Sequence, residues 1–251
     1  MAEIVNSFPY PNPTGMAYNY VTRQLYVCDT TSGYISVYTR EGIFVEQWLH
    51  GCGAPNGMDI DSDDPDILWV TDQSTMVKIS ISAHAKLQSW NMSYPINGVA
   101  APPGLYMWLG LTTGVRRVLK SDPTGAFVNV PWPISISDLA WDGVYLWVSG
   151  FSTQIQAINL ADYSLVYSFT GTSAEITALT TDGHYMWAGD DTNNNIVQFY
   201  IEKIASRNAA YYFNGISMTR IRNLKFLGSI MTPSRNMKHN VGVGEYGGTT
   251  L

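Results

Sequence analysis

Short segments that open on small or polar residues recur along this chain of 251 residues at intervals of 38 to 42. Their polar members are Thr14, Asn56, Asn97, Ser137 with Asp138, Thr177 and Asn214. Amide and carboxylate oxygens can ligate divalent cations, and hydroxyl and amide groups can hydrogen bond to polar ligands. If the repeats converge, these side chains form a polar, nearly uncharged ring. We take Asn56, Asn97, Asp138 and Asn214 from it as candidate binding residues.

Two other segments are rich in side-chain oxygens. The acidic run 61–66 has Pro65 where a calcium loop needs a ligand and lacks the glycine of its sharp turn, so it favours a solvated turn. The run 189–195 is the better candidate for a cation or a hydrogen-bonded ligand, and we single out Asp191 and Asn193 within it.

Three further aspartates, Asp29, Asp72 and Asp190, come where a strand meets a turn. A carboxylate at such a position can accept backbone N–H groups and hold the loop. We therefore interpret these three side chains as structural.

Nucleophilic chemistry has no candidate. The histidines His50, His84, His184 and His239 are scattered, and no serine or cysteine is paired with a base by any motif. The two cysteines cannot form a disulfide framework. We assign no catalytic residue, no resident metal and no cofactor.

The elements that position these residues repeat with the same period. An apolar cluster centred on an aromatic residue recurs at Tyr26, Trp69, Trp108, Trp147 and Trp187, in steps of 43, 39, 39 and 40. One more period leads to a degenerate copy near Phe226. Because such residues pack between repeats, we interpret the anchors as core. Trp132, which lies between two prolines, is the preferred exposed contact.

Each repeat has the alternation and turn residues of four short strands. Units of about 40 residues with four strands are typical of propeller blades. The sequence therefore predicts an all-β, six-bladed β-propeller spanning 1–251 as a single domain. The sixth unit, 215–246, supplies only three strands before a glycine-rich tail at 242–251. We expect the N-terminal segment 2–8 to complete that last blade and close the ring.

The first repeat resembles the NHL repeat. It contains Pro13-Thr14-Gly15-Met16, then Leu25-Tyr26-Val27-Cys28-Asp29, then a strand that ends in a glycine turn. The resemblance implies a propeller that serves as a platform for protein or RNA. The architecture also resembles gluconolactonase-type propellers, which hold a metal with a glutamate, an asparagine and an aspartate. Asn97 and Asp138 could serve in such a site, but no glutamate lies on the expected inner strands.

Charge is segregated along the chain. Residues 1–201 contain seven Lys or Arg against eighteen Asp or Glu, a net charge of −11, whereas residues 202–251 carry +5. The acidic balance disfavours nucleic acid as a partner. The basic segment, with Arg220 and Arg222, is a candidate contact with an acidic neighbouring subunit. An RNA-binding role for it is the third possibility.

With 45% hydrophobic residues, 14% charged residues and no apolar run near 18 residues, the composition favours a folded chain that does not insert into a membrane. No signal peptide is visible, so we expect a cytoplasmic or virion location. The short loops leave little room for an active site. We expect a non-enzymatic interaction or assembly module that binds other protein subunits or a surface glycan within a larger homo- or hetero-oligomer, such as a phage or virion component. The alternative is a metal-dependent, lactonase-like hydrolase at the channel mouth.

Overall fold

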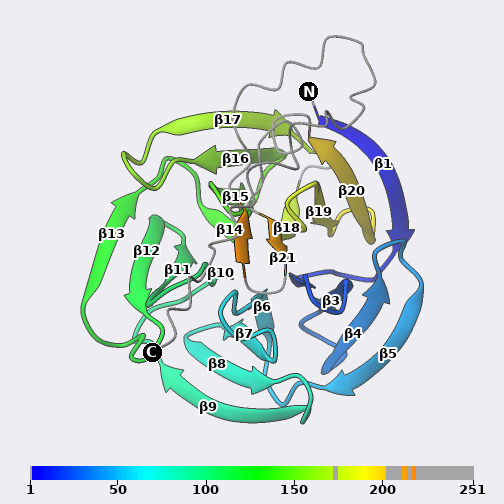
Figure 1. Cartoon of the computed structure of the whole chain (residues 1–251), viewed down its shortest axis with the longest axis horizontal. Coiled ribbons are helices and arrows are strands. Elements are labelled where there is room, and N and C mark those ends of the chain that lie inside the picture. Colours follow the sequence, from blue (N-terminus) through cyan, green and yellow to red (C-terminus); the bar gives the residue numbers. More distant parts are fainter. Residues whose placement is uncertain (1, 172–174, 202–210, 214–215, 219–251) are drawn as a thin grey trace, which may run out of the picture. The chain divides into compact units, whose positions relative to one another are not determined.

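The computed structural model describes residues 2–171, 175–201, 211–213 and 216–218. They form five antiparallel sheets of four strands each, arranged as the blades of a β-propeller (Figure 1), and one short hairpin. The expectation of an all-β propeller with four-stranded blades is confirmed, but the structure has five blades where six were expected. Within these residues, no helix is long and apolar enough to cross a membrane.

In each of blades 1 to 4, four consecutive strands pair in order from the innermost to the outermost. Blade 1 consists of β2 (Gly15–Asn19), β3 (Gln24–Cys28), β4 (Tyr34–Thr39) and β5 (Phe44–Leu49). Blade 2 consists of β6 (Pro55–Ile60), β7 (Ile67–Asp72), β8 (Thr75–Ser80) and β9 (Ala85–Asn91). Blade 3 consists of β10 (Gly98–Ala100), β11 (Tyr106–Leu111), β12 (Gly114–Leu119) and β13 (Phe127–Pro131). Blade 4 consists of β14 (Ile136–Trp141), β15 (Leu146–Gly150), β16 (Gln154–Ile158) and β17 (Leu165–Thr170).

Blade 5 combines segments from distant parts of the chain. Its first three strands, from the innermost outward, are β18 (Ile176–Thr181), β19 (Tyr185–Asp190) and β20 (Asn195–Ile201). The fourth strand is β1 (Ala2–Pro9), which pairs antiparallel with β20. The N-terminal segment was expected to complete the last blade, counted as a sixth. It is the fourth strand of the last sheet, but that sheet is the fifth, so only its assignment to a sixth blade is wrong.

Blade 5 also lies directly against blade 1, which leaves no position for a further sheet between them. The ring of Tyr18 stacks on that of Trp187 at a centroid distance of 5.2 Å, and the Thr177 hydroxyl donates to the carbonyl of Pro13. The repeat count gave six because it accepted Phe226, which lacks the tryptophan, as an anchor.

Most of the expected sixth blade and the whole tail 242–251 lie outside the described residues. The hairpin formed by β21 (Tyr211–Phe213) and β22 (Ile216–Met218) is the part of that region that the structure describes.

The core consists of apolar clusters between neighbouring blades. Five clusters of the described residues correspond to the five interfaces, and each contains one repeat anchor. Trp147 and Trp187 are fully buried, and Tyr26, Trp69 and Trp108 nearly so. Because a buried indole removes roughly 150–250 Å² from water, the anchors are major contributors to the attraction between blades. Their interpretation as core residues is confirmed.

Candidate functional site

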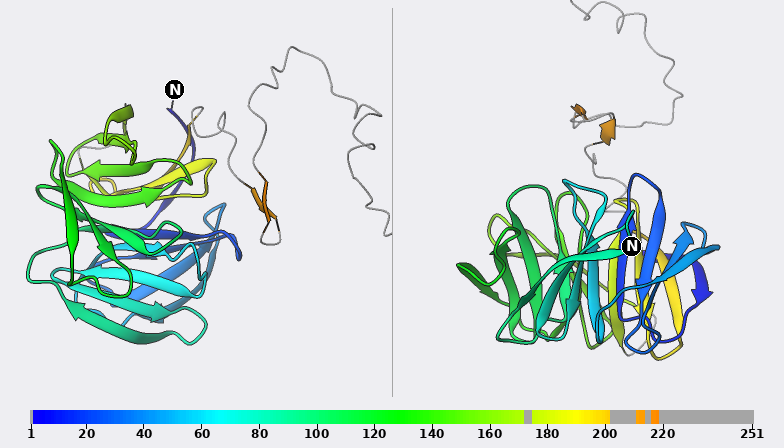
Figure 2. Two further views of the ribbon diagram at one scale, coloured as in Figure 1. Left: turned by 60° about the vertical axis from the view of Figure 1, so that its left-hand side comes forward. Right: turned by 90° about the horizontal axis from the view of Figure 1, so that it is seen from below.

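The strands of the blades run between two opposite faces of the propeller (Figure 2). We call the loops that lead into the inner strands β2, β6, β10, β14 and β18 the start rim. The loops that follow those strands form the end rim: 20–23, 61–66, 101–105, 142–145 and 182–184.

The recurring polar residues lie on the start rim, and most of them hydrogen bond from one blade to the next. The acceptor in each case is a carbonyl at the start of the next inner strand. The bonds are Thr14 Oγ1 to Pro55 O (2.7 Å), Asn97 Nδ2 to Ile136 O (2.7 Å), Ser137 Oγ to Ile176 O (2.6 Å) and Thr177 Oγ1 to Pro13 O. These side chains therefore join the blades.

Local backbone irregularity accompanies this arrangement. The register of the inner strands shifts at Asn56, Ser137 and Thr177, each of which is an extra residue opposite the neighbouring strand. Such a bulge re-aims a side chain, and for Ser137 and Thr177 the side chain meets the next blade. Asn56 differs from them, since its amide has no hydrogen-bond partner among the described residues. At that interface Thr71 Oγ1 donates to the carbonyl of Asn97 (3.3 Å).

Asp138 lies among the inner strands just inside the start rim. Its side chain is fully buried and accepts the N–H groups of Leu139 (2.9 Å) and Leu179 (2.8 Å). A Cβ on Gly57 or Gly98 would lie 2.8 or 2.7 Å from Asp138 Oδ1, so the carboxyl contacts blades 2 and 3 as well as blade 5. Burial raises its pKa well above the usual range. Its geometry is that of a cap on the channel-facing N–H groups of the inner strands.

A second carboxyl, Asp59, lies toward the other end of the channel. It accepts the N–H groups of Ile60 (2.9 Å) and Ala101 (2.7 Å), but its side chain is only partly buried. Burial raises the pKa of Asp59 to about 7. From the end rim, the Tyr20 hydroxyl donates to the carbonyl of Thr181 (3.0 Å), which connects blade 1 to blade 5.

The turns of the end rim are held by aspartate or asparagine side chains. Asn19 Oδ1 accepts the N–H of Val21 (2.9 Å), and Asp142 Oδ1 accepts the N–H of Val144 (2.8 Å). Asp182 Oδ1 likewise accepts the N–H of His184 (2.8 Å). These turns project apolar side chains into solvent: Tyr20 is 50% exposed, Val21 72%, Leu105 72% and Val144 42%.

The acidic run 61–66 belongs to the same rim and is engaged by protein groups. Lys120 Nζ lies 2.7 Å from Asp61 Oδ1 and 3.0 Å from Asp63 Oδ2, and the N–H of Gly104 donates to Asp63 (2.8 Å). Trp69 Nε1 donates to Asp61 Oδ2 (2.9 Å). The run therefore joins blade 2 to blade 3, a role beyond that of a simple solvated turn.

The turn aspartates behave as expected. Asp29 accepts the N–H of Thr31 (2.7 Å), Asp72 accepts that of Gly53 (2.7 Å), and Asp190 accepts that of Asn193 (2.9 Å). The Asn193 amide also donates to Asp190 (2.9 Å), so Asn193 is held within the turn, and a binding role for Asp191 stays a prediction. Among the described residues, no three histidine, cysteine or acidic side chains gather as metal ligands would.

Trp132 lies half-buried between blades 3 and 4. Its indole Nε1 donates to Gln156 Oε1 (2.7 Å), and its ring packs on the cluster of that interface. Trp132 was expected to be an exposed contact; it is only partly exposed, its N–H is engaged within the propeller, and its role in binding stays a prediction. Asn214, Arg220 and Arg222 lie outside the described residues.

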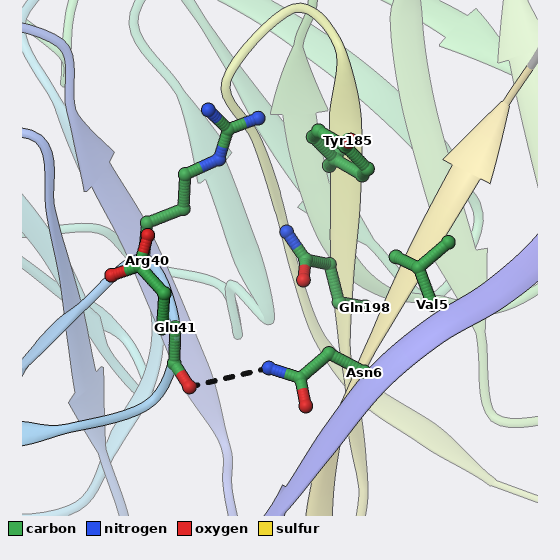
Figure 3. Close-up of a pocket in the computed structure, with 6 residues that line it drawn as sticks. All are labelled: Val5, Asn6, Arg40, Glu41, Tyr185 and Gln198. Carbon is green, nitrogen blue, oxygen red and sulfur yellow. Dashed lines mark hydrogen bonds between the residues drawn. The ribbon is translucent and has the colours of Figure 1, made fainter.

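A surface pocket lies where blade 5 meets blade 1 (Figure 3), with a volume of about 340 Å³. Its lining residues are Val5, Asn6, Arg40, Glu41, Tyr185 and Gln198. No sequence pattern indicated it. Its residues meet because β1 pairs with β20 and blade 5 adjoins blade 1, whereas the six-blade prediction placed another sheet between them.

No protein-family model matches the chain, and no curated protein matches it in sequence. Among solved structures, a glutaminyl cyclase of Myxococcus xanthus is similar, with a TM-score of 0.65 and 12% identity over 79% of this chain and 95% of that chain. At this identity the similarity shows a shared fold. The NHL resemblance is supported only as far as the propeller architecture.

Proposed function

We propose that this propeller is a non-enzymatic interaction module and that its end rim docks another protein. The observation that carries the proposal is the set of exposed apolar side chains on the turns of the end rim. On the start rim, most of the polar side chains form hydrogen bonds between neighbouring blades. On the end rim, four large apolar side chains from three blades are 42–72% exposed.

Exposed apolar side chains gathered on one face are typical of contact surfaces, in which an apolar centre is surrounded by polar groups. Tyr20 and Val21 come from blade 1, Leu105 from blade 3 and Val144 from blade 4. The acidic loop 61–66 of blade 2 supplies a polar border. A partner with an apolar patch and basic residues beside it fits this rim.

The alternative is a hydrolase with Asn97 and Asp138 at the channel mouth. The geometry favours it less, because the Asn97 amide nitrogen donates to Ile136 O and Asp138 is fully buried and engaged with backbone N–H groups. The cyclase among the structural neighbours makes an enzyme assay worthwhile. Lactone hydrolysis with and without divalent cations, and glutaminyl cyclisation, are the two reactions to measure.

The docking test compares a double variant, Leu105→Asp with Val144→Asp, with a matched pair on outer strands, Leu87→Asp with Leu165→Asp. The outer-strand side chains are similarly exposed, at 54% and 52%. We expect crosslinking and light scattering of the full chain to detect a defined assembly, and the rim variant to weaken it at least tenfold. Burying one such side chain contributes roughly 1.5–3 kcal/mol, and 1.4 kcal/mol is tenfold in affinity.

Equal loss in both double variants, or turnover in either assay, would contradict the proposal.

A further inference from the structure

We propose that the pocket between blades 1 and 5 binds the ring of a neutral sugar. The inference is independent of the docking proposal, since the end-rim apolar side chains do not line this pocket. It rests on an unpartnered amide, on the charge balance of the pocket and on its size.

The amide belongs to Gln198, in the middle of β20. In the sheet it stands opposite Asn6 on one side and Trp187 on the other. Its side chain is only 7% exposed, yet its carboxamide has no hydrogen-bond partner among the described residues and points into the pocket (Figure 3). Neither polar atom of the amide is among the buried, unpartnered side-chain atoms of the described residues, so the amide is open to water from the pocket. A ligand that both donates and accepts hydrogen bonds could replace that water.

Charge argues for a neutral ligand. Arg40 Nη2 lies 2.9 Å from Asp182 Oδ2, and its guanidinium lies over the Tyr185 ring at 4.5 Å from the ring centre. Its charge is therefore already balanced, and Glu41 adds a negative charge to the lining. A phosphate or carboxylate would meet no unpaired cation here.

The remaining groups suit a polyhydroxyl ring. Asn6 Nδ2 donates to the carbonyl of Glu41 (3.2 Å), which leaves Asn6 Oδ1 as an acceptor and the Gln198 amide as both donor and acceptor. Val5, which lies at a bulge in β1 and is 46% exposed, and Tyr185 offer apolar surface to the carbon-bound hydrogens of the ring. The volume of about 340 Å³ is at the lower end for ligand sites, as expected for a small ligand.

The test is saturation-transfer NMR on the full chain with glucose, galactose, mannose and N-acetylglucosamine. Inorganic phosphate and acetate serve as anionic comparisons. An array of immobilised glycans then distinguishes a free sugar from the end of a glycan. We expect at least one sugar to bind and the anions not to compete with it.

Two variants locate the binding. Gln198→Leu removes the amide and Val5→Trp fills the pocket from an exposed position, and each should weaken binding at least tenfold. Gln88→Leu, on the exposed outer strand β9, is the matched control and should bind as the wild type does. If Gln198→Leu fails to fold, Val5→Trp decides alone. Absence of sugar binding, preference for an anion, or unchanged binding in Val5→Trp would overturn the proposal. The Leu105→Asp rim variant should retain sugar binding, which keeps the two proposals separable.

Discussion

The start and end rims of the propeller are formed at opposite ends of the same five inner strands, but they expose different chemistry. On the start rim, hydroxyl and amide side chains bond to the next blade, and Asp138 is sealed beneath them. On the end rim, side-chain oxygens hold each turn internally, and the tips of the turns carry exposed apolar groups. Polar residues that converge at one end of the inner strands can therefore serve to join the blades, while turns that are held by their own side chains leave apolar groups exposed at the other end.

The largest expected effect comes from the two channel carboxyls. Each accepts two backbone N–H groups, but Asp138 is fully buried and Asp59 is not. Asp138→Ala leaves two N–H groups that water cannot reach, so we expect the free energy of unfolding to fall by about 3–5 kcal/mol. Asp59→Ala should cost about 1 kcal/mol, because water can replace its carboxylate. Urea denaturation measures both, and equal losses would contradict the assigned difference between the two ends of the channel.

The raised pKa of Asp59 predicts that the free energy of unfolding depends on pH. Burial raises the pKa of Asp59 to about 7, against about 3.9 for an aspartate in an unfolded chain. Between these values the folded chain holds a proton that the unfolded chain has released, so stability falls as pH rises from about 4 to 7. The slope from one such group is at most about 1.4 kcal/mol per pH unit.

Asp59→Asn should flatten that slope when unfolding is measured at several pH values between 4.5 and 7.5. Asp66, whose pKa the N–H of Ser82 lowers, gives the opposite trend only below about pH 4. His50, whose pKa burial lowers, gives it up to about pH 6.5, so the test is the difference between the variant and the wild type. The same slope in Asp59→Asn and in the wild type would refute the assignment.

The sequence predicted the blade elements well because their signals are local. Anchors such as Trp69 and Trp147 carry the period, and alternation marks the strands around them. The blade number was wrong because the segment near Phe226 was accepted as a sixth repeat. The strand around Ile4 was expected in the last blade, but its partner is β20 of the fifth sheet. The polar residues of the first five repeats lie on the start rim, and Asn214 lies outside the described residues. The bonds that these residues make could not be predicted, because acceptors such as Ile136 O belong to a different repeat. The pocket between blades 1 and 5 could not be predicted, since its residues meet only when blade 5 packs against blade 1.

The smallest expected effect is also the most selective, because it compares two asparagines at equivalent positions of the start rim. Asn97 donates to Ile136 O at 2.7 Å, whereas the Asn56 amide has no partner among the described residues. Asn97→Ala should therefore lower the free energy of unfolding by about 1 kcal/mol, the usual net contribution of one hydrogen bond. Asn56→Ala should change it by less than about 0.5 kcal/mol. Matched urea titrations resolve this difference. If Asn56→Ala is the more costly change, the bond from Asn97 is not what holds blades 3 and 4 together, and the amide of Asn56 must be binding something that its neighbours do not provide.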